Sequence, residues 1–241
     1  MRDLRKPAVS VPCFAAGLLW LAAPLSASQS SGATITIGRD TVIAADIVVP
    51  ESTTLVIKPG VTIGFASYGK FLVRGLLVAQ GMRSSPIRIT CPGRPFGVKE
   101  HPCWQGLIIY GRKAHALLTW VRIEGAYATT VSEARPVLES CELVGNHHAL
   151  YAIRGGAPHV RNCRIYRNVY GVVSDHAMPI MLDNLITENT VGVQLRFSAE
   201  LVAGKNTIKG NETDIHSDRS FGTTGESAAL QDLWNLMLET Y

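Results

Sequence analysis

The repeats that decide the fold run from Pro136 to Asp218. They read PVLESCELVGNHHALYAIRGGA (136–157), PHVRNCRIYRNVYGVVSDHAM (158–178), PIMLDNLITENTVGVQLRFSA (179–199) and ELVAGKNTIKGNETDIHSD (200–218). A period of about 21 or 22 residues indicates a solenoid, because one such unit cannot bury its apolar face alone and stacked units share a continuous core.

Equivalent positions of the repeats carry the same kind of residue. The columns are Cys141, Cys163, Asn184, Asn206; Leu143, Ile165, Ile186, Ile208; Asn146, Asn168, Asn189, Asn211; and Leu150, Val172, Val193, Ile215. The apolar residues fall in short groups and form no helical stripe, which favours strands. Parallel strands would stack equivalent side chains about 4.8 Å apart. An inward Asn column could then form a hydrogen-bonded ladder that satisfies bent backbone at a corner.

The tetrads Asn184–Thr187 and Asn206–Lys209, each followed by a further Asn, resemble the repeats of right-handed parallel β-helix proteins of the pectin-lyase-like group. Thr54–Val61 and Gly75–Gly81 resemble segments of bacterial envelope members. The resemblance implies an all-β fold with a single right-handed parallel β-helix. It implies no single activity, since this fold carries lyases, hydrolases, epimerases, adhesins and inert scaffolds.

Residues 1–28 have the pattern of a secretory signal peptide. Basic residues precede an apolar run from Phe14 to Leu25, and small residues follow it. The run is too short to span a membrane, so we expect no transmembrane segment in the mature chain. The predicted division is therefore a signal peptide (1–28), a β-helix (29–218) and a C-terminal tail (219–241). The protein is expected in the periplasm, at the cell surface or outside the cell.

Charge and composition narrow the expected partners. The whole chain has a formal net charge of +4, and removal of Arg2, Asp3, Arg5 and Lys6 with the leader leaves +2. A nearly balanced surface argues against nucleic acid as the main partner, because phosphate binding needs a clustered positive field. No cofactor is expected. At the observed period the mature chain would form roughly eight or nine rungs.

The cysteines suggest two different situations. Cys91 and Cys103 bracket a segment rich in Pro and Gly, which in an exported protein indicates a disulfide closing a surface loop. Cys141 and Cys163 occupy one inward column on adjacent rungs, within the distance that permits a bridge. They could equally be buried thiols that replace the Asn residues of the later repeats.

The two ends of the repeat region carry other patterns. Ala33 to Pro50 alternate apolar and polar residues and are expected to form the opening strands and an N-terminal cover. After Asp218, Ser227 can cap a helix with Leu230, Leu233, Trp234, Met237 and Tyr241 on one face. This helix is expected to cap the solenoid, and the alternative is docking on a partner or membrane surface.

Asp175, Arg196 and Asp218 share an outward column of the late repeats. The two carboxylates would lie two rungs, or about 9.6 Å, apart, near the upper limit for an inverting glycosidase. They are therefore the candidate catalytic residues. The alternative is an exposed ladder of alternating charges with little effect on stability and none in catalysis.

Histidines provide the metal candidates. His176, Met178 and Met181 are close in sequence, and soft Met and His ligands select Cu(I). A periplasmic protein that assists copper-site assembly has the β-helix fold that this chain resembles. The alternative is that Met181 packs in the core. His147 and His148 are adjacent, so on extended backbone we expect their rings to point to opposite faces and not to hold one ion together.

Three functions remain open from the sequence. The first is a non-catalytic protein that binds a polysaccharide or an envelope protein, with Tyr151, Gln194 and His216 on the binding face. The second is a polysaccharide lyase or glycoside hydrolase, although the catalytic motifs of pectate lyases and polygalacturonases do not occur in the sequence. The third is copper handling. A deep groove beside the Cys91–Cys103 loop would favour an enzyme, and a flat face would favour binding.

Overall fold

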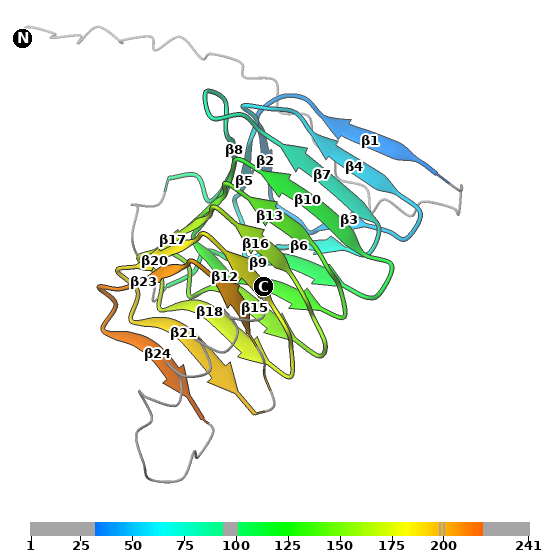
Figure 1. Cartoon of the computed structure of the whole chain (residues 1–241). Helices are drawn as coiled ribbons and strands as arrows, with labels where there is room; N and C mark the ends of the chain where they lie inside the picture. The colour runs from blue at the N-terminus through cyan, green and yellow to red at the C-terminus, as the bar shows by residue number, and fades with distance from the viewer. Residues whose placement is uncertain (1–31, 94–100, 198, 200, 219–241) are drawn as a thin grey trace, which may run out of the picture. The chain divides into compact units, whose positions relative to one another are not determined.

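The structure is a computed structural model that describes residues 32–93, 101–197, 199 and 201–218. In these residues the strands form three eight-stranded sheets, and consecutive strands go in turn to the first, second and third sheet (Figure 1). Strand-to-strand pairing is parallel, as between β1 and β4. Each turn of the chain, or rung, therefore adds one strand to each sheet. This confirms the predicted parallel β-helix and its number of rungs.

The first sheet contains β1 (Thr34–Ile37), β4 (Thr54–Ile57), β7 (Leu76–Gln80), β10 (His115–Thr119), β13 (Val137–Glu139), β16 (His159–Arg161), β19 (Ile180–Leu182) and β22 (Val202–Gly204). The second contains β2 (Thr41–Ile43), β5 (Thr62–Phe65), β8 (Ile87–Thr90), β11 (Val121–Glu124), β14 (Glu142–Val144), β17 (Arg164–Tyr166), β20 (Leu185–Thr187) and β23 (Thr207–Ile208). The third contains β3 (Ile47–Val49), β6 (Lys70–Val73), β9 (Trp104–Tyr110), β12 (Ala126–Ser132), β15 (His148–Ile153), β18 (Tyr170–Asp175), β21 (Val191–Arg196) and β24 (Thr213–Ser217).

The core consists of inward side chains stacked rung on rung. Alternation along a strand sends every second residue inward, and the parallel register places Leu143 beside Ile165 and Ile165 beside Ile186. All three are at most 1% exposed. The few aromatic core residues lie near the N-terminal rungs, where the rings of Phe65 and Trp104 stack at 4.6 Å. Burial of these apolar columns supplies the main driving force for folding.

From β9 to β24, each corner of the coil uses a residue in the left-handed region of backbone space. The residues at the corner from first to second sheet are Trp120, Ser140, Asn162, Asp183 and Lys205. Those at the second corner are Gly125, Gly145, Arg167, Glu188 and Gly210, and those at the third corner are Gly111, Glu133, Arg154, His176 and Phe197. One positive φ turns the chain sharply between two strands, so the corners can be short. For a residue other than Gly this conformation costs about 1–2 kcal/mol.

Two ladders of inward polar groups satisfy the bent backbone. At the second corner the side-chain oxygen of Asn168 accepts hydrogen bonds from the backbone and side-chain nitrogens of Asn146, at 2.8 and 3.1 Å. Asn189 does the same for Asn168. At the first corner Asn184 accepts from the backbone of Cys163 at 2.9 Å. The predicted Asn ladder is confirmed.

At the N-terminal end, the structure has the expected opening strands, but residues 33–50 form no separate cover. Residues 33–50 include β1, β2 and β3, which pair with β4, β5 and β6 as an ordinary first rung. The signal peptide and the C-terminal helix were predicted for residues outside the described ranges. In the described part of the chain, no helix is long and apolar enough to cross a membrane.

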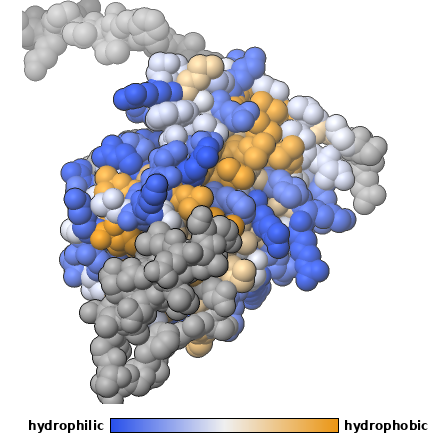
Figure 2. Space-filling model, viewed as in Figure 1, coloured by the Kyte–Doolittle hydropathy of each residue, from blue (hydrophilic) through white to orange (hydrophobic). Residues whose placement is uncertain are grey.

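An apolar stripe follows the outer face of the first sheet. Register places Val56, Val78, Leu117 and Val137 beside one another on successive strands. Leu117 and Val137 are 40% and 38% exposed. Apolar side chains gather over this sheet in Figure 2, in the view of Figure 1. The same sheet also carries the Arg161–Glu139 ion pair at the ends of β13 and β16, and the second sheet carries ion pairs such as Arg122–Glu142.

Candidate functional site

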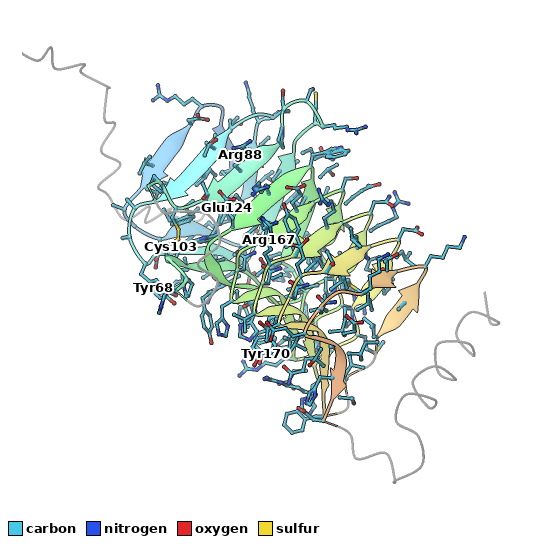
Figure 3. All side chains as sticks on the ribbon, turned by 90° about the vertical axis from the view of Figure 1, so that its left-hand side faces the viewer. Tyr68, Arg88, Cys103, Glu124, Arg167 and Tyr170 are labelled. Atoms are coloured by element: carbon cyan, nitrogen blue, oxygen red, sulfur yellow. A yellow bond between two sulfur atoms is a disulfide. The ribbon has the colours of Figure 1, made fainter. Side chains whose placement is uncertain are left out.

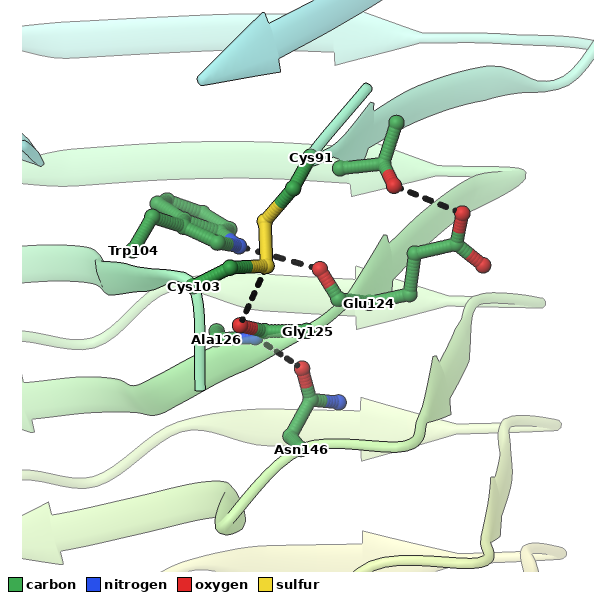
Figure 4. The surroundings of a disulfide bond; sticks show 8 residues. Cys91, Cys103, Trp104, Glu124, Gly125, Ala126 and Asn146 are labelled. Atoms are coloured by element: carbon green, nitrogen blue, oxygen red, sulfur yellow. Dashed lines mark hydrogen bonds between the residues drawn. A yellow bond between two sulfur atoms is a disulfide. The ribbon is translucent and has the colours of Figure 1, made fainter. Parts of the chain in front are cut away.

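A disulfide joins Cys91 to Cys103, as predicted, at the corner between the second and third sheets. Figure 4 shows Trp104 beside it, whose ring nitrogen donates a hydrogen bond to the Glu124 carbonyl at 2.9 Å. Gly125 lies against the sulfurs: a Cβ there would be 2.8 Å from the Cys103 sulfur. Ala126 follows Gly125 in the chain, and its backbone nitrogen donates a hydrogen bond to the Asn146 side chain at 2.9 Å. The bridge therefore lies next to the N-terminal end of the Asn column.

The other cysteine pair is not bonded. Cys141 and Cys163 are buried free thiols, so of the two alternatives left by the sequence the structure shows the second. The Cys141 backbone nitrogen donates to the Cys163 sulfur at 3.3 Å. That is the contact which Asn184 makes with Cys163 one rung later. Burial raises the pKa of the Cys141 thiol, which keeps it protonated and unreactive.

Beside the disulfide corner, five rings from three rungs form a contiguous group on the outside of the third sheet. This ring cluster consists of Tyr127, His147, His148, Tyr151 and Tyr170. His148 stacks with Tyr170 at 4.9 Å and with Tyr151 at 5.2 Å, and Tyr127 stacks with His147 at 5.1 Å. Figure 3 shows Tyr68, Cys103 and Tyr170 along one edge of the second sheet.

Parallel register builds the ring cluster. β15 pairs with β18 so that His148 lies opposite Tyr170, and β12 pairs with β15 so that Ala128 lies opposite His148. The small side chain of Ala128 leaves room beside His148. A register shift between β12 and β15 then places Tyr151 opposite Thr130. The rings are therefore held by backbone pairing on neighbouring rungs.

The expectation that the rings of His147 and His148 point to opposite faces was wrong. The Nδ1 atoms of His147 and His148 are 2.9 Å apart, close enough to share a hydrogen bond. The alternation rule does not apply, because His147 belongs to the corner and β15 begins at His148. The pair still lacks the ligand set of a metal centre. Among the described residues no group of three or more His, Cys, Asp or Glu side chains could hold a metal ion.

His148 is the perturbed group of the cluster. It is 7% exposed. Burial, followed by the charges of His147 and Arg196, lowers the pKa of His148 from 6.5 to about 4. The ring is therefore neutral at pH 7, with one donor and one acceptor nitrogen. Tyr127, by contrast, is 44% exposed, so the cluster combines a buried, fixed ring with rings that reach solvent.

The Asp–Arg–Asp column forms at the C-terminal end of the same sheet. Asp175 pairs with Arg196 across β18 and β21, and Asp218 lies 4.0 Å from Arg196 between Oδ2 and Nε. Each aspartate also contacts an imidazole. Asp175 Oδ1 lies 2.6 Å from His176 Nδ1, and Asp218 Oδ1 lies 3.0 Å from His216 Nε2. The predicted column thus exists, with two Asp–His pairs that the sequence had not indicated.

The predicted binding face is only partly open. Tyr151, Val173, Gln194 and His216 do occupy one column. Tyr151 is partly exposed and belongs to the ring cluster, and His216 is exposed. Gln194 is buried, and its amide oxygen accepts a hydrogen bond from Arg196 at 3.0 Å. Gln194 therefore positions Arg196.

The copper candidates do not meet. Met181 is 1% exposed and packs in the core, whereas Met178 is 50% exposed. His176 pairs with Asp175 and stacks on Phe197 at 5.0 Å.

A family model described as right-handed β-helix region matches residues 118–227. The three-sheet parallel coil and this match agree. The chain therefore has the right-handed parallel β-helix fold. Neither the curated proteins nor the solved structures contained a significant match to it. The fold of this β-helix protein supports the pectin-lyase-like grouping, and the fold alone does not separate a binder from an enzyme.

Part of the ring cluster of the β-helix could have been found in the sequence. Tyr170 follows His148 by one period of 22 residues, so both belong to one column. Tyr127 precedes His147 by only 20 residues, so the repeat period does not align these two residues in one column. Register across unequal rungs is a property of strand pairing, which the repeat pattern alone does not give.

Proposed function

We propose that this β-helix protein is an exported, non-catalytic protein that binds a glycan through the ring cluster. The observation that carries the proposal is the contiguity of five aromatic or imidazole rings from three rungs on one outer face. Aromatic and imidazole groups provide apolar surface together with a polar edge. A sugar presents the complementary pattern, since its ring carries apolar C–H faces and peripheral hydroxyl groups.

The cluster is preorganised for such a ligand. His148 is held by stacking on Tyr170 and Tyr151, within 20° of parallel to both rings. Its partner His147 hydrogen-bonds it directly. Few rotamers remain to be ordered when a ligand binds, which reduces the entropic cost of association. The neutral imidazole and the tyrosine hydroxyls can both donate and accept hydrogen bonds.

A glycan array tests the proposal. We expect the purified protein to bind a subset of glycans and to leave them uncleaved. Tyr170→Ala removes a ring that packs on both His147 and His148, and it should weaken binding about tenfold. Tyr166→Ala is the matched control, because Tyr166 is a partly exposed tyrosine on the second sheet. Equal losses in both variants, or silence of the whole array, would reject the proposal.

Export is the second part of the proposal. Its support is the basic and apolar pattern of residues 1–28 and the Cys91–Cys103 disulfide, a bond typical of oxidising compartments. Expression with the native N-terminus in a bacterial host should yield a secreted or periplasmic form that begins near residue 28 or 29. Intact mass spectrometry of the purified product measures this directly. A product that retains Met1 or starts at Arg2 would contradict export.

One observation favours a second candidate function, a polysaccharide hydrolase or lyase. Arg196 lies between two aspartates, and each aspartate contacts a histidine. Carboxylate–imidazole pairs can serve in proton transfer. If this candidate holds, a bound glycan is converted to products with new reducing or unsaturated ends. Asp175→Asn should then abolish turnover while leaving glycan affinity unchanged, and Asp183→Asn, on an exposed corner, should leave both unchanged.

A further inference from the structure

A second surface feature lies at the third corner, away from the ring cluster. Arg112, Arg135 and Arg154 line an open hollow of ≈ 590 Å³ together with His115, Glu133 and Gly155. The three arginines belong to the loops that follow β9, β12 and β15, which are neighbouring strands of the third sheet. They therefore stand on consecutive rungs, about 4.8 Å apart per rung.

These arginines have no acidic partner among the described residues. Within the described part of the chain, no hydrogen bond or ion pair joins Arg112, Arg135 or Arg154 to a carboxylate, although Glu133 lines the same hollow. The nearby Lys113 is paired, since its Nζ lies 3.1 Å from Glu51. With one glutamate against three guanidinium groups, the hollow keeps a net positive charge.

From β11 onward, the described arginines outside the third corner lie beside carboxylates. Arg122 lies between Glu124 and Glu142, and Arg164 contacts Glu142 from the next rung. Arg161 and Arg167 contact Glu139 and Glu188. A parallel coil stacks like positions over one another, so alternating charges avoid repulsion between rungs. The third corner departs from that rule on three successive rungs.

We propose that the hollow formed by Arg112, Arg135 and Arg154 binds an acidic glycan that runs along the coil. Guanidinium groups present a planar set of donors that matches carboxylate, sulfate and phosphate oxyanions. Three of them in a row at rung spacing suit a ligand whose anionic groups repeat along a chain. A bound polyanion also removes the repulsion between the arginines, which gives the uncompensated charge a physical reason.

The backbone supports this role. Arg154 and Glu133 occupy the left-handed position of their corners, at φ 48° and 56°. This conformation fixes where each side chain leaves the corner. The next residue, Gly155, has nothing within 4 Å of its Cβ position, so the hollow is unobstructed there. His115, at the start of β10, connects the hollow to the outer face of the first sheet.

Binding of defined polymers to the full chain tests the proposal. The probes are hyaluronan for carboxylate, dextran sulfate for sulfate and unmodified dextran as the neutral control, each measured by biolayer interferometry at low and high salt. We expect at least one acidic polymer to bind, neutral dextran not to bind, and affinity to fall with salt. The polymer that binds more tightly identifies the preferred acidic group.

A charge-matched pair of variants separates the hollow from general attraction. The triple variant Arg112→Gln, Arg135→Gln, Arg154→Gln should weaken binding of the acidic polymer about tenfold or more. The control triple Arg39→Gln, Arg83→Gln, Arg88→Gln removes the same charge from exposed arginines elsewhere. It should change affinity less than about twofold. Equal losses in the two triples, or no binding of either acidic polymer by the wild type, would overturn the proposal.

The ring cluster is independent of this site, so the two proposals fail separately. Tyr170→Ala should leave affinity for the acidic polymer unchanged. If Tyr170→Ala abolishes that binding and the Arg112, Arg135, Arg154 triple does not, the acidic polymer binds at the ring cluster, which would also overturn the assignment to the hollow. Circular dichroism of each variant confirms that the fold is retained.

Discussion

At the scale of single residues, the coil depends on backbone positions that only Gly can occupy without conflict. Gly106, in β9, has φ +118°, and a Cβ there would lie 1.8 Å from the carbonyl oxygen of Ala128 on the next rung. Gly111 has φ +100°, with nothing within 4 Å of its Cβ position. A comparison of substitutions at Gly106 and Gly111 therefore separates the cost of steric conflict from the cost of a positive φ.

We predict that Gly106→Ala lowers the free energy of unfolding by more than about 3 kcal/mol, because β9 must move away from β12. Gly111→Ala should cost about 1–2 kcal/mol, from the positive φ alone. Chemical denaturation of both variants measures the difference. Equal costs for the two substitutions would contradict the close approach of β9 and β12.

His148 gives a prediction about pH. Its folded pKa of about 4 lies below the unfolded value of 6.5. Above pH 6.5 the ring is neutral in both the folded and the unfolded state, so protonation of His148 does not reduce the free energy of unfolding there. As pH falls from 6.5 towards 4 the unfolded chain binds the proton first, so the free energy of unfolding decreases by about 3 kcal/mol in total.

The measurement is the free energy of unfolding of wild type and His148→Phe between pH 7.5 and 3.5. Other groups also titrate in this range, so the difference between the two proteins is the quantity of interest. The wild type should lose about 3 kcal/mol more than the variant. Parallel curves for the two proteins would show that His148 is not protonated preferentially in the unfolded chain.

At the scale of elements, the Asn column at the second corner connects the rungs. Asn168 is fully buried, accepts from Asn146 and donates to Asn189 and to the carbonyls of Leu143 and Tyr166. The column ends at Asn211, which is partly exposed. On the N-terminal side of Asn146, the backbone beside the disulfide continues the column. The column thus joins the disulfide to the last rung in one hydrogen-bonded series.

Removing a central amide should therefore cost more than removing a terminal one. Asn168→Ala leaves several buried polar groups without partners, and we predict a loss of about 3 kcal/mol or more. Asn211→Ala should cost about 1 kcal/mol, since water can replace its contacts. Thermal or urea unfolding compares them. Similar losses at both positions would show that the ladder does not depend on burial.

At the scale of the whole molecule, the repeat pattern was sufficient to predict the fold. The columns of Asn and of aliphatic residues in residues 136–218 correspond to strand register in the structure, because parallel stacking maps sequence period directly onto space. The disulfide was also predictable from its bracketed loop. The same logic placed Asp175 opposite Arg196 correctly.

The candidate sites were less predictable, because they depend on where the regular pattern breaks. The ring cluster needs the register shift between β12 and β15 and the corner position of His147, neither of which follows from the period. The arginine hollow forms because three loops of different sequence lie side by side at the third corner. Whether Gln194 reaches solvent depends on its neighbours, and the structure shows it buried.

The measurement that tests the account most directly is the glycan affinity of the Tyr127→Ala, Tyr170→Ala double variant, by isothermal titration calorimetry with the tightest glycan from the array. These residues are the rings at the two ends of the cluster in chain order. The account predicts a loss of at least about thirtyfold, against less than about twofold for Tyr166→Ala. Unchanged affinity in the double variant would show that the ring cluster is not the glycan site.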